Sequence, residues 1–154
     1  MSGHFAQFKL LSASAKSPTR AHPTDAGLDL YSPRRHVLKP GLTTINMSIA
    51  IENSQHVYFL IKDRSSMAAK GVIVCGGVID SGYMGPIKCI FYNSTEKDIH
   101  ITKHSRIAQL VPQIQVGLNI RETVEDFPVR KPVAKRVKRP TVKLIDVPDN
   151  LDLT

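Results

Sequence analysis

The sequence has little that would suit a zinc finger, a disulfide scaffold or a membrane span. Cys75 and Cys89 are its only cysteines, and it contains neither a CxxC nor an HExxH motif. Both cysteines lie in apolar, strand-like stretches without a nearby histidine pair, which predicts reduced core thiols. No apolar run approaches the length of a membrane-spanning helix. Residues 1–11 lack the pattern of a secretion signal, so we expect an intracellular protein, in the cytoplasm, the nucleus or both.

A sustained 3.6-residue apolar period is also missing before Gly117. Short β-branched and aromatic runs alternate instead with turn residues, about 8–12 residues apart, as in sandwiches and barrels. Strands are expected at residues 5–11, 28–31, 36–38, 42–52, 57–61, 71–75, 85–93, 99–101 and 107–116. One short helix is expected at 65–69, with Ser as a good N-cap residue. The pattern predicts an all-β fold, and 154 residues suit one domain with a core.

The end of the chain differs in composition from the rest. No glycine follows Gly117, and residues 130–143 hold seven basic residues and no acidic one. We therefore expect a β-domain over residues 1–118 and an extended or mobile arm over residues 119–154. The net charge of +8 favours polyanionic partners. The basic run suits weak nucleic-acid contact or nuclear import, and it equally suits a solvated tail without a partner.

Two segments combine charged groups with hydroxyls in the first half of the chain. Residues 26–31 place Asp29 between leucines that would fill a core, so its carboxylate would point the other way. Residues 63–68 place Arg64 beside Ser65 and Ser66, where they could hold a phosphate at a helix start. Taken singly, the two segments are more simply explained as a solvated surface acid and a plain capping turn.

Two further segments follow. Residues 76–85 carry Asp80 and Tyr83 in a glycine-rich hairpin that would let a ligand approach the backbone closely. Residues 105–111 carry Arg106 and Gln109, three positions apart in an expected strand. A structural hairpin accounts for the glycines of the first segment, but not for its acid and tyrosine together. The second segment alone would pass as an ordinary strand with two polar side chains.

In order and spacing, the four segments resemble the first four signature motifs of the trimeric dUTPase family, over residues 26–110. The resemblance implies a jelly-roll-like β-barrel or sandwich and a homotrimer with active sites at its subunit interfaces. The third motif would come from a neighbouring subunit. It also implies Mg²⁺-dependent hydrolysis of dUTP to dUMP and pyrophosphate. That reaction limits uracil incorporation into DNA and supplies dUMP for thymidylate synthesis.

The resemblance also implies a role for individual residues. Asp80 resembles the acid that orients the attacking water, and Asp29 resembles the acid that holds Mg²⁺ through water. Tyr83 would pack against the deoxyribose and leave no space for a 2′-hydroxyl. The triphosphate would be positioned by Arg64, Ser65, Ser66 and Gln109. The edge of uracil would be read by backbone groups of Gly77, Val78, Ile79 and Lys88.

The family's glycine-rich fifth motif has no counterpart in this sequence. Phe127 is the only aromatic residue left to stack over uracil, and Arg130 and Lys131 could replace the missing phosphate contacts. These three residues form a hypothetical lid. One alternative is a dUTPase-like protein that has lost turnover and acts as a regulatory or binding module. A less favoured alternative, dCTP deaminase, shares the fold but needs a glutamate where this chain has Ile90.

Overall fold

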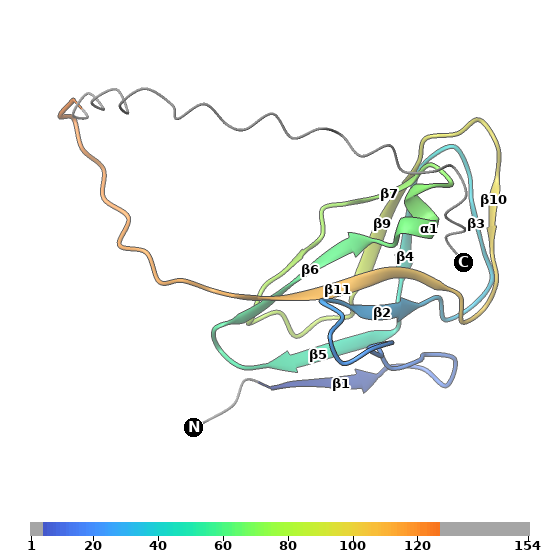
Figure 1. Cartoon of the computed structure of the whole chain (residues 1–154), viewed down its shortest axis with the longest axis horizontal. Helices are drawn as coiled ribbons and strands as arrows, with labels where there is room; N and C mark the ends of the chain where they lie inside the picture. The colour runs from blue at the N-terminus through green and yellow to red at the C-terminus, as the bar shows by residue number, and fades with distance from the viewer. Residues whose placement is uncertain (1–4, 127–154) are drawn as a thin grey trace, which may run out of the picture. The chain divides into compact units, whose positions relative to one another are not determined.

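The computed structural model describes residues 5–126, which contain eleven strands and one short helix (Figure 1). The first half consists of β1 (Ala6–Leu10), β2 (Leu28–Tyr31), β3 (His36–Leu38), β4 (Gly41–Asn46), β5 (Ile49–Asn53) and β6 (Val57–Asp63). The second half consists of α1 (Ser65–Ala68), β7 (Val72–Cys75), β8 (Val78–Ile79), β9 (Lys88–Asn93), β10 (Ile99–Ile101) and β11 (Arg106–Ile114). The all-β prediction is confirmed.

Two antiparallel sheets make up most of the fold. One has the strand order β2-β11-β6-β8 and the other the order β4-β9-β7. Two shorter pairs, β1-β5 and β3-β10, lie beside them (Figure 1). Neighbours in the sheets are distant in the sequence, as in a jelly roll, and the described strands do not close into a barrel. The predicted jelly-roll-like architecture is therefore that of a sandwich.

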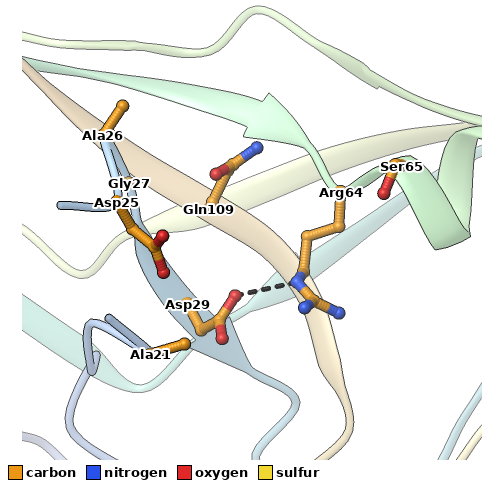
Figure 2. Close-up of a pocket in the computed structure, with 8 residues that line it drawn as sticks. All are labelled: Ala21, Asp25, Ala26, Gly27, Asp29, Arg64, Ser65 and Gln109. Atoms are coloured by element: carbon orange, nitrogen blue, oxygen red, sulfur yellow. Dashed lines mark ion pairs between the residues drawn. The ribbon is translucent and has the colours of Figure 1, made fainter. Parts of the chain in front are cut away.

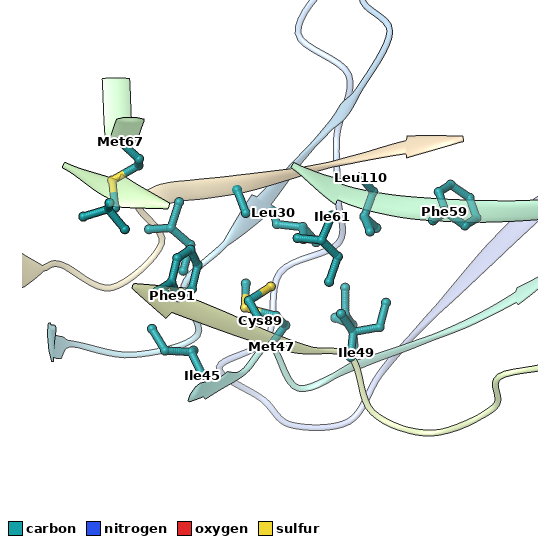
Figure 3. Close-up of a cluster of buried hydrophobic side chains, with 14 of the residues drawn as sticks. Leu30, Ile45, Met47, Ile49, Phe59, Ile61, Met67, Cys89, Phe91 and Leu110 are labelled. Carbon is teal, nitrogen blue, oxygen red and sulfur yellow. The ribbon is translucent and has the colours of Figure 1, made fainter. Parts of the chain in front are cut away.

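The core fills the space between the two main sheets (Figure 3). Leu30, Ile61 and Leu110 from β2, β6 and β11 are at most 3% exposed. They face Cys89 and other apolar side chains of the second sheet. Alternation along the strands explains this arrangement, since residues two apart share a face of a sheet. The predicted core position of Cys89 is confirmed.

The segment predicted as one strand over residues 42–52 forms two strands, so that prediction is wrong. β4 ends at Asn46 and β5 begins at Ile49. Ser48 between them has a φ of 56°, in the left-handed region. The side-chain Oδ1 of Asn46 accepts a hydrogen bond from the Ser48 N–H at 2.9 Å. An apolar alternation that runs on through this point hides the turn, because Met47 is buried as a strand residue would be.

The short helix also differs in detail from its prediction. Arg64 is the N-cap residue of α1, and it makes no side-chain capping hydrogen bond. Ser65 is the first helical residue and not the cap. Met67 anchors the helix, because its side chain is buried in the core. The helix therefore owes its place to packing and to the end of β6 that leads into it.

A compact unit ends at Leu118. The described residues that follow it, 119–126, contain neither helix nor strand. No helix within residues 5–126 is long and apolar enough to span a bilayer. The basic run over residues 130–143 lies outside the described residues.

Candidate active site

The backbone of Asp29 in β2 has a neighbouring segment on each side. On one side it lies directly opposite Gln109 of β11. On the other side its N–H donates to the carbonyl oxygen of Thr19 at 2.7 Å. The adjacent Leu30 is buried in the core, so the carboxylate of Asp29 points to the opposite face of the sheet. The predicted orientation of this acid is confirmed.

An irregularity in β11 brings two polar residues to that same face. Arg106 pairs with Tyr31 and Ala108 pairs with Leu30, so one extra residue of β11 lies between the two pairs. In a regular strand, residues three apart such as Arg106 and Gln109 would point to opposite faces. The extra residue in the bulge shifts the alternation by one position. The side chains of Arg106 and Gln109 therefore both lie on the face of the sheet that carries Asp29.

Two guanidinium groups meet the carboxylate of Asp29, and Figure 2 shows the pair with Arg64. Arg64 Nε lies 2.8 Å from Asp29 Oδ1, and Arg106 Nη1 lies 3.4 Å from Asp29 Oδ2. Arg64 Nη1 also donates to the carbonyl oxygen of Arg106, at 3.5 Å. The side chain of Asp29 is only 12% exposed. One carboxylate therefore fixes two cations, which retain further N–H donors for an anionic ligand.

Asp29 and Arg64 line a cavity of about 260 Å³. Its lining residues are Ala21, Asp25, Ala26, Gly27, Asp29, Arg64, Ser65 and Gln109. A Cβ atom at position 27 would lie 2.4 Å from Gln109 Oε1, so a side chain there would displace the amide of Gln109. Gln109 Nε2 donates to the carbonyl oxygen of Asp63 at 2.8 Å. The amide of Gln109 is thereby oriented between Gly27 and Arg64, as Figure 2 shows.

The glycine-rich hairpin begins next to β6. The carbonyl oxygen of Gly77 accepts a hydrogen bond from the Ile61 N–H at 2.6 Å, and β8 pairs with β6. The Tyr83 N–H donates to the carbonyl oxygen of Asp80 at 3.1 Å, which closes the turn. Tyr83 also donates from its hydroxyl to the carbonyl oxygen of Pro86 at 3.0 Å. Asp80 is exposed and Tyr83 is 41% exposed, so both present their side chains to solvent.

The structure separates the predicted site residues into groups. Asp29, Arg64, Ser65 and Gln109 meet in the cavity of Figure 2. Gly77 and Val78 line a second cavity, near the end of β6. Among residues 5–126, the predicted site residues that line neither cavity are Ser66, Ile79, Asp80, Tyr83 and Lys88. The lid residues Phe127, Arg130 and Lys131 lie outside the described residues.

Comparison with known proteins decides the family. Residues 13–131 match the family model described as dUTPase. This chain belongs to the dUTPase family. A deoxyuridine 5′-triphosphate nucleotidohydrolase from Clostridium tetani is 38% identical over an alignment of 126 residues, and the match covers 79% of this chain and 87% of the relative. A second one, from Paramecium bursaria Chlorella virus 1, is 38% identical over an alignment of 123 residues, and the match covers 75% of this chain and 87% of the relative.

A solved structure supports the same assignment. It contains a variant of the dUTPase of Staphylococcus bacteriophage 80alpha with dUpNHpp. The TM-score is 0.74 at 26% identity, and the match covers 86% of this chain and 96% of the phage chain. The similarity therefore extends through both main sheets of this dUTPase family member and not only through its motifs.

The structure adds three residues that the sequence reasoning did not assign to the site of this dUTPase. Arg106 pairs with Asp29, and Asp25 lines the same cavity. Asp63 accepts hydrogen bonds both through its backbone and through its carboxylate. Arg106 belongs to a segment that the sequence had marked, so its position beside Gln109 was a usable signal. Asp63 begins the marked segment 63–68, but nothing in the sequence indicated its contacts with Gln109 and Val74, which form only in the folded chain.

Proposed function

We propose that this dUTP diphosphatase cleaves dUTP to dUMP and pyrophosphate with Mg²⁺, at sites that form between the subunits of a homotrimer. One observation carries the proposal. The cavity around Asp29 offers guanidinium, hydroxyl and amide donors, whereas the exposed acid and the exposed ring, Asp80 and Tyr83, are carried on a separate hairpin. The cavity would hold the phosphates, and the hairpin would supply the carboxylate and the ring. Hydrolysis of a nucleoside triphosphate would use both.

The cavity suits the triphosphate part of the substrate. Its volume of about 260 Å³ is below the 300–1,000 Å³ usual for a whole ligand of drug size. Arg64, Ser65 and Gln109 would donate to phosphate oxygens from its walls, and Ser66 would add a donor from the helix. Donors that are already oriented cost little rearrangement when charge develops on those oxygens. The ion pair with Asp29 provides that orientation for Arg64.

Asp29 fits an indirect role in holding Mg²⁺. Magnesium usually takes one or two carboxylates, several waters and the substrate phosphates. Among residues 5–126 there is no cluster of three or more His, Cys, Asp or Glu side chains that could form a complete metal cage. Because both oxygens of Asp29 already contact guanidinium groups, a cation would reach this carboxylate through water. When bound, Mg²⁺ would offset the negative charge of the phosphates.

The hairpin would supply the base and the platform for the sugar. Asp80 would orient the attacking water and accept its proton as the water attacks the α-phosphorus. A positioned general base contributes about 10²–10⁴-fold to a rate. Tyr83, held by its hydrogen bond to Pro86, would pack its ring against the deoxyribose and exclude a 2′-hydroxyl. Backbone groups of Gly77, Val78, Ile79 and Lys88 would pair with the edge of uracil.

The separation of the two groups within one chain favours a complete site built from two or more copies. In residues 5–126 of a single chain, Asp80 and Tyr83 do not line the cavity that holds Arg64 and Gln109. A hairpin from a neighbouring subunit would bring a carboxylate and a ring to the mouth of that cavity. Three copies arranged in a ring would complete three such sites.

The end of the chain would cover the bound nucleotide. We expect residues 119–154 to act as an arm, in which Phe127 stacks over uracil and Arg130 and Lys131 contact the terminal phosphate. Truncation after Val129 should then raise KM for dUTP, since both cations are removed. An unchanged kcat/KM in the truncated protein would dismiss this lid.

The cellular role follows from the reaction. Hydrolysis of dUTP would limit uracil incorporation into DNA and supply dUMP for thymidylate synthesis. We expect the protein to act inside cells, in the cytoplasm or the nucleus, where this nucleotide is made. Weak contact of the basic run with nucleic acid stays a prediction from sequence. DNA binding that vanishes between low and moderate salt would identify it as contact with phosphates alone.

Release of pyrophosphate from dUTP with Mg²⁺ tests the proposal directly. The parent protein should turn over, and Asp80→Asn should lower kcat by about 10²–10⁴-fold because an amide cannot accept the proton. Sedimentation should show a trimer for both proteins. An Asp80→Asn variant as fast as the parent, or a protein that is strictly monomeric while active, would contradict the mechanism. No release at high enzyme concentration would favour a binding module instead.

A further inference from the structure

Asp63 is the last residue of β6, and its carboxylate connects the two main sheets. Asp63 Oδ1 accepts a hydrogen bond from the backbone N–H of Val74 at 2.5 Å. Val74 belongs to β7, which pairs with β9 along its other edge. An edge strand leaves backbone N–H groups that need a partner, and here a side chain supplies one. A single carboxylate thus ties the sheet that contains β6 to the sheet that contains β7.

The backbone of the same residue holds a side chain of the phosphate cavity. The carbonyl oxygen of Asp63 accepts the hydrogen bond from Gln109 Nε2, at 2.8 Å. Arg64 follows directly in the sequence, and its guanidinium reaches Asp29. The position of the Asp63 backbone therefore affects two of the groups that line the cavity, the amide of Gln109 and the guanidinium of Arg64.

Asp63 is assigned no contact with the reacting atoms. It does not line the cavity around Asp29; it lines the second cavity, with Gly77 and Val78, and its carboxylate is turned toward β7. We propose that Asp63 is a positioning residue: its carboxylate fixes the end of β6 against β7, so that Arg64 and Gln109 meet the triphosphate in the correct place. This inference rests on the proposed function, because it names a residue that serves the same site indirectly.

Removal of the carboxylate should affect the triphosphate more than the rest of the nucleotide. Asp63→Ala leaves the Val74 N–H without its acceptor and frees the end of β6. A displacement of about 1 Å at a positioned group can cost about 10²-fold in rate. We expect Asp63→Ala to raise KM for dUTP by about tenfold and to lower kcat/KM by about 10–100-fold on this basis. Asp63→Asn keeps an acceptor oxygen and should stay within about threefold of the parent, in line with a retained hydrogen bond.

The experiment compares both variants with the parent in kinetics, binding and amide exchange. Calorimetry gives the Kd of dUpNHpp, which has a full triphosphate chain, and of dUMP, which has only the α-phosphate. Asp63→Ala should weaken dUpNHpp about tenfold and dUMP by less than about twofold, since dUMP lacks two of the three phosphates that the cavity would hold. Hydrogen exchange at the Val74 amide should accelerate in Asp63→Ala and not in Asp63→Asn. Asp98→Ala removes an exposed carboxylate that makes no side-chain hydrogen bond or ion pair within residues 5–126, and it should change none of these values.

Three results would overturn the inference. Asp63→Ala could retain the kcat/KM of the parent, it could weaken dUpNHpp and dUMP equally, or it could behave exactly as Asp63→Asn does. A parent protein that binds dUpNHpp but releases no pyrophosphate would contradict the proposed hydrolysis alone. The positioning role would then be decided by the two Kd values and by exchange at Val74.

Discussion

Arg64 Nε lies 2.8 Å from Asp29 Oδ1, and this ion pair joins the start of α1 to the middle of β2. Arg106 Nη1 contacts the other oxygen of the same carboxylate, at 3.4 Å. The side chain of Arg64 is 24% exposed, so the pair is partly shielded from water and holds its geometry better than an exposed pair would. The guanidinium of Arg64 is thereby oriented before any ligand arrives.

Substitution of Arg64 should show how much the oriented guanidinium contributes to kcat/KM for dUTP. Arg64→Ala is expected to lower kcat/KM for dUTP by about 10²–10³-fold, the usual loss for one oriented donor to a developing charge. Arg64→Lys keeps the charge but not the planar fork, so it should recover only part of that loss. Steady-state kinetics measure both. Arg35→Ala, which removes an exposed arginine on the β3 side of the fold, serves as the control and should match the parent. An Arg64→Lys variant with full activity would refute the geometric requirement.

Two glycines of the hairpin should respond differently to an added methyl group. A Cβ atom at Gly77 would lie 2.4 Å from the backbone oxygen of Ile61, whereas one at Gly82 would meet nothing within 4 Å. Gly77→Ala is expected to destabilise the fold by about 1–3 kcal/mol, because backbone must move to admit the methyl group. Gly82→Ala should stay within about 0.5 kcal/mol of the parent. Urea unfolding at one protein concentration compares them, and equal stabilities would count against this packing.

The pH dependence of stability should contain a contribution from His36. Burial, and secondarily the charge of Arg34, lower the pKa of His36 from its ordinary 6.5. His36 Nε2 is buried and has no hydrogen-bond partner within residues 5–126. Below pH 6.5, His36 therefore binds a proton more readily in the unfolded chain than in the folded chain. Stability from this group is full above pH 6.5 and falls as the pH drops, until both states are protonated.

The variant His36→Phe removes this titration and keeps an aromatic ring in β3. Between pH 7 and pH 5 the parent should lose more unfolding free energy than His36→Phe does. Denaturant titrations over a pH series measure the difference, in which the contributions of the other histidines cancel. Parallel pH profiles for the two proteins would show that His36 is charged as easily in the folded state as in the unfolded one.

The two cysteines should differ in reactivity. Cys89 is fully buried, and burial raises its pKa to about 12, so almost no thiolate forms near neutral pH. Cys75 is half-buried on β7. A thiol reagent at pH 8 should therefore modify at most one thiol in the native protein and both in denaturant. The variant Cys75→Ser should be unreactive until it unfolds, and fast native labelling of that variant would contradict the buried position.

Much of the fold could be predicted from the sequence, because the alternation of apolar and polar residues in a strand is a local property. β2, β3 and β10 have the predicted bounds, and the other predicted strands differ by a few residues at their ends. The break between β4 and β5 was missed because a buried Met47 continues the apolar pattern through a turn. β8 was missed because its two residues pair with β6 only after the hairpin returns to that strand.

The site could be predicted only in part from the sequence. The resemblance to the dUTPase motifs indicated phosphate and metal roles for Asp29, Arg64 and Gln109, and the structure brings all three to one cavity. The lining role of Asp25 and the cross-sheet contact of Asp63 were not visible, since each depends on how separate elements pack in the folded chain. The roles of Asp80 and Tyr83 stay predictions, because a single chain does not bring them to that cavity.

By itself, the sequence determined the all-β class, the apolar side chains of the core and the chemical groups available for catalysis. These depend on residue type and on a two-residue period, which are local properties. Only the tertiary structure decided that Arg106 and Gln109 share a face. They are three residues apart, and it takes the bulge in β11, which exists only through pairing with β2, to turn both toward Asp29. The packing of the two sheets likewise decided that Asp63 contacts β7, since β6 and β7 are consecutive in the chain but belong to different sheets.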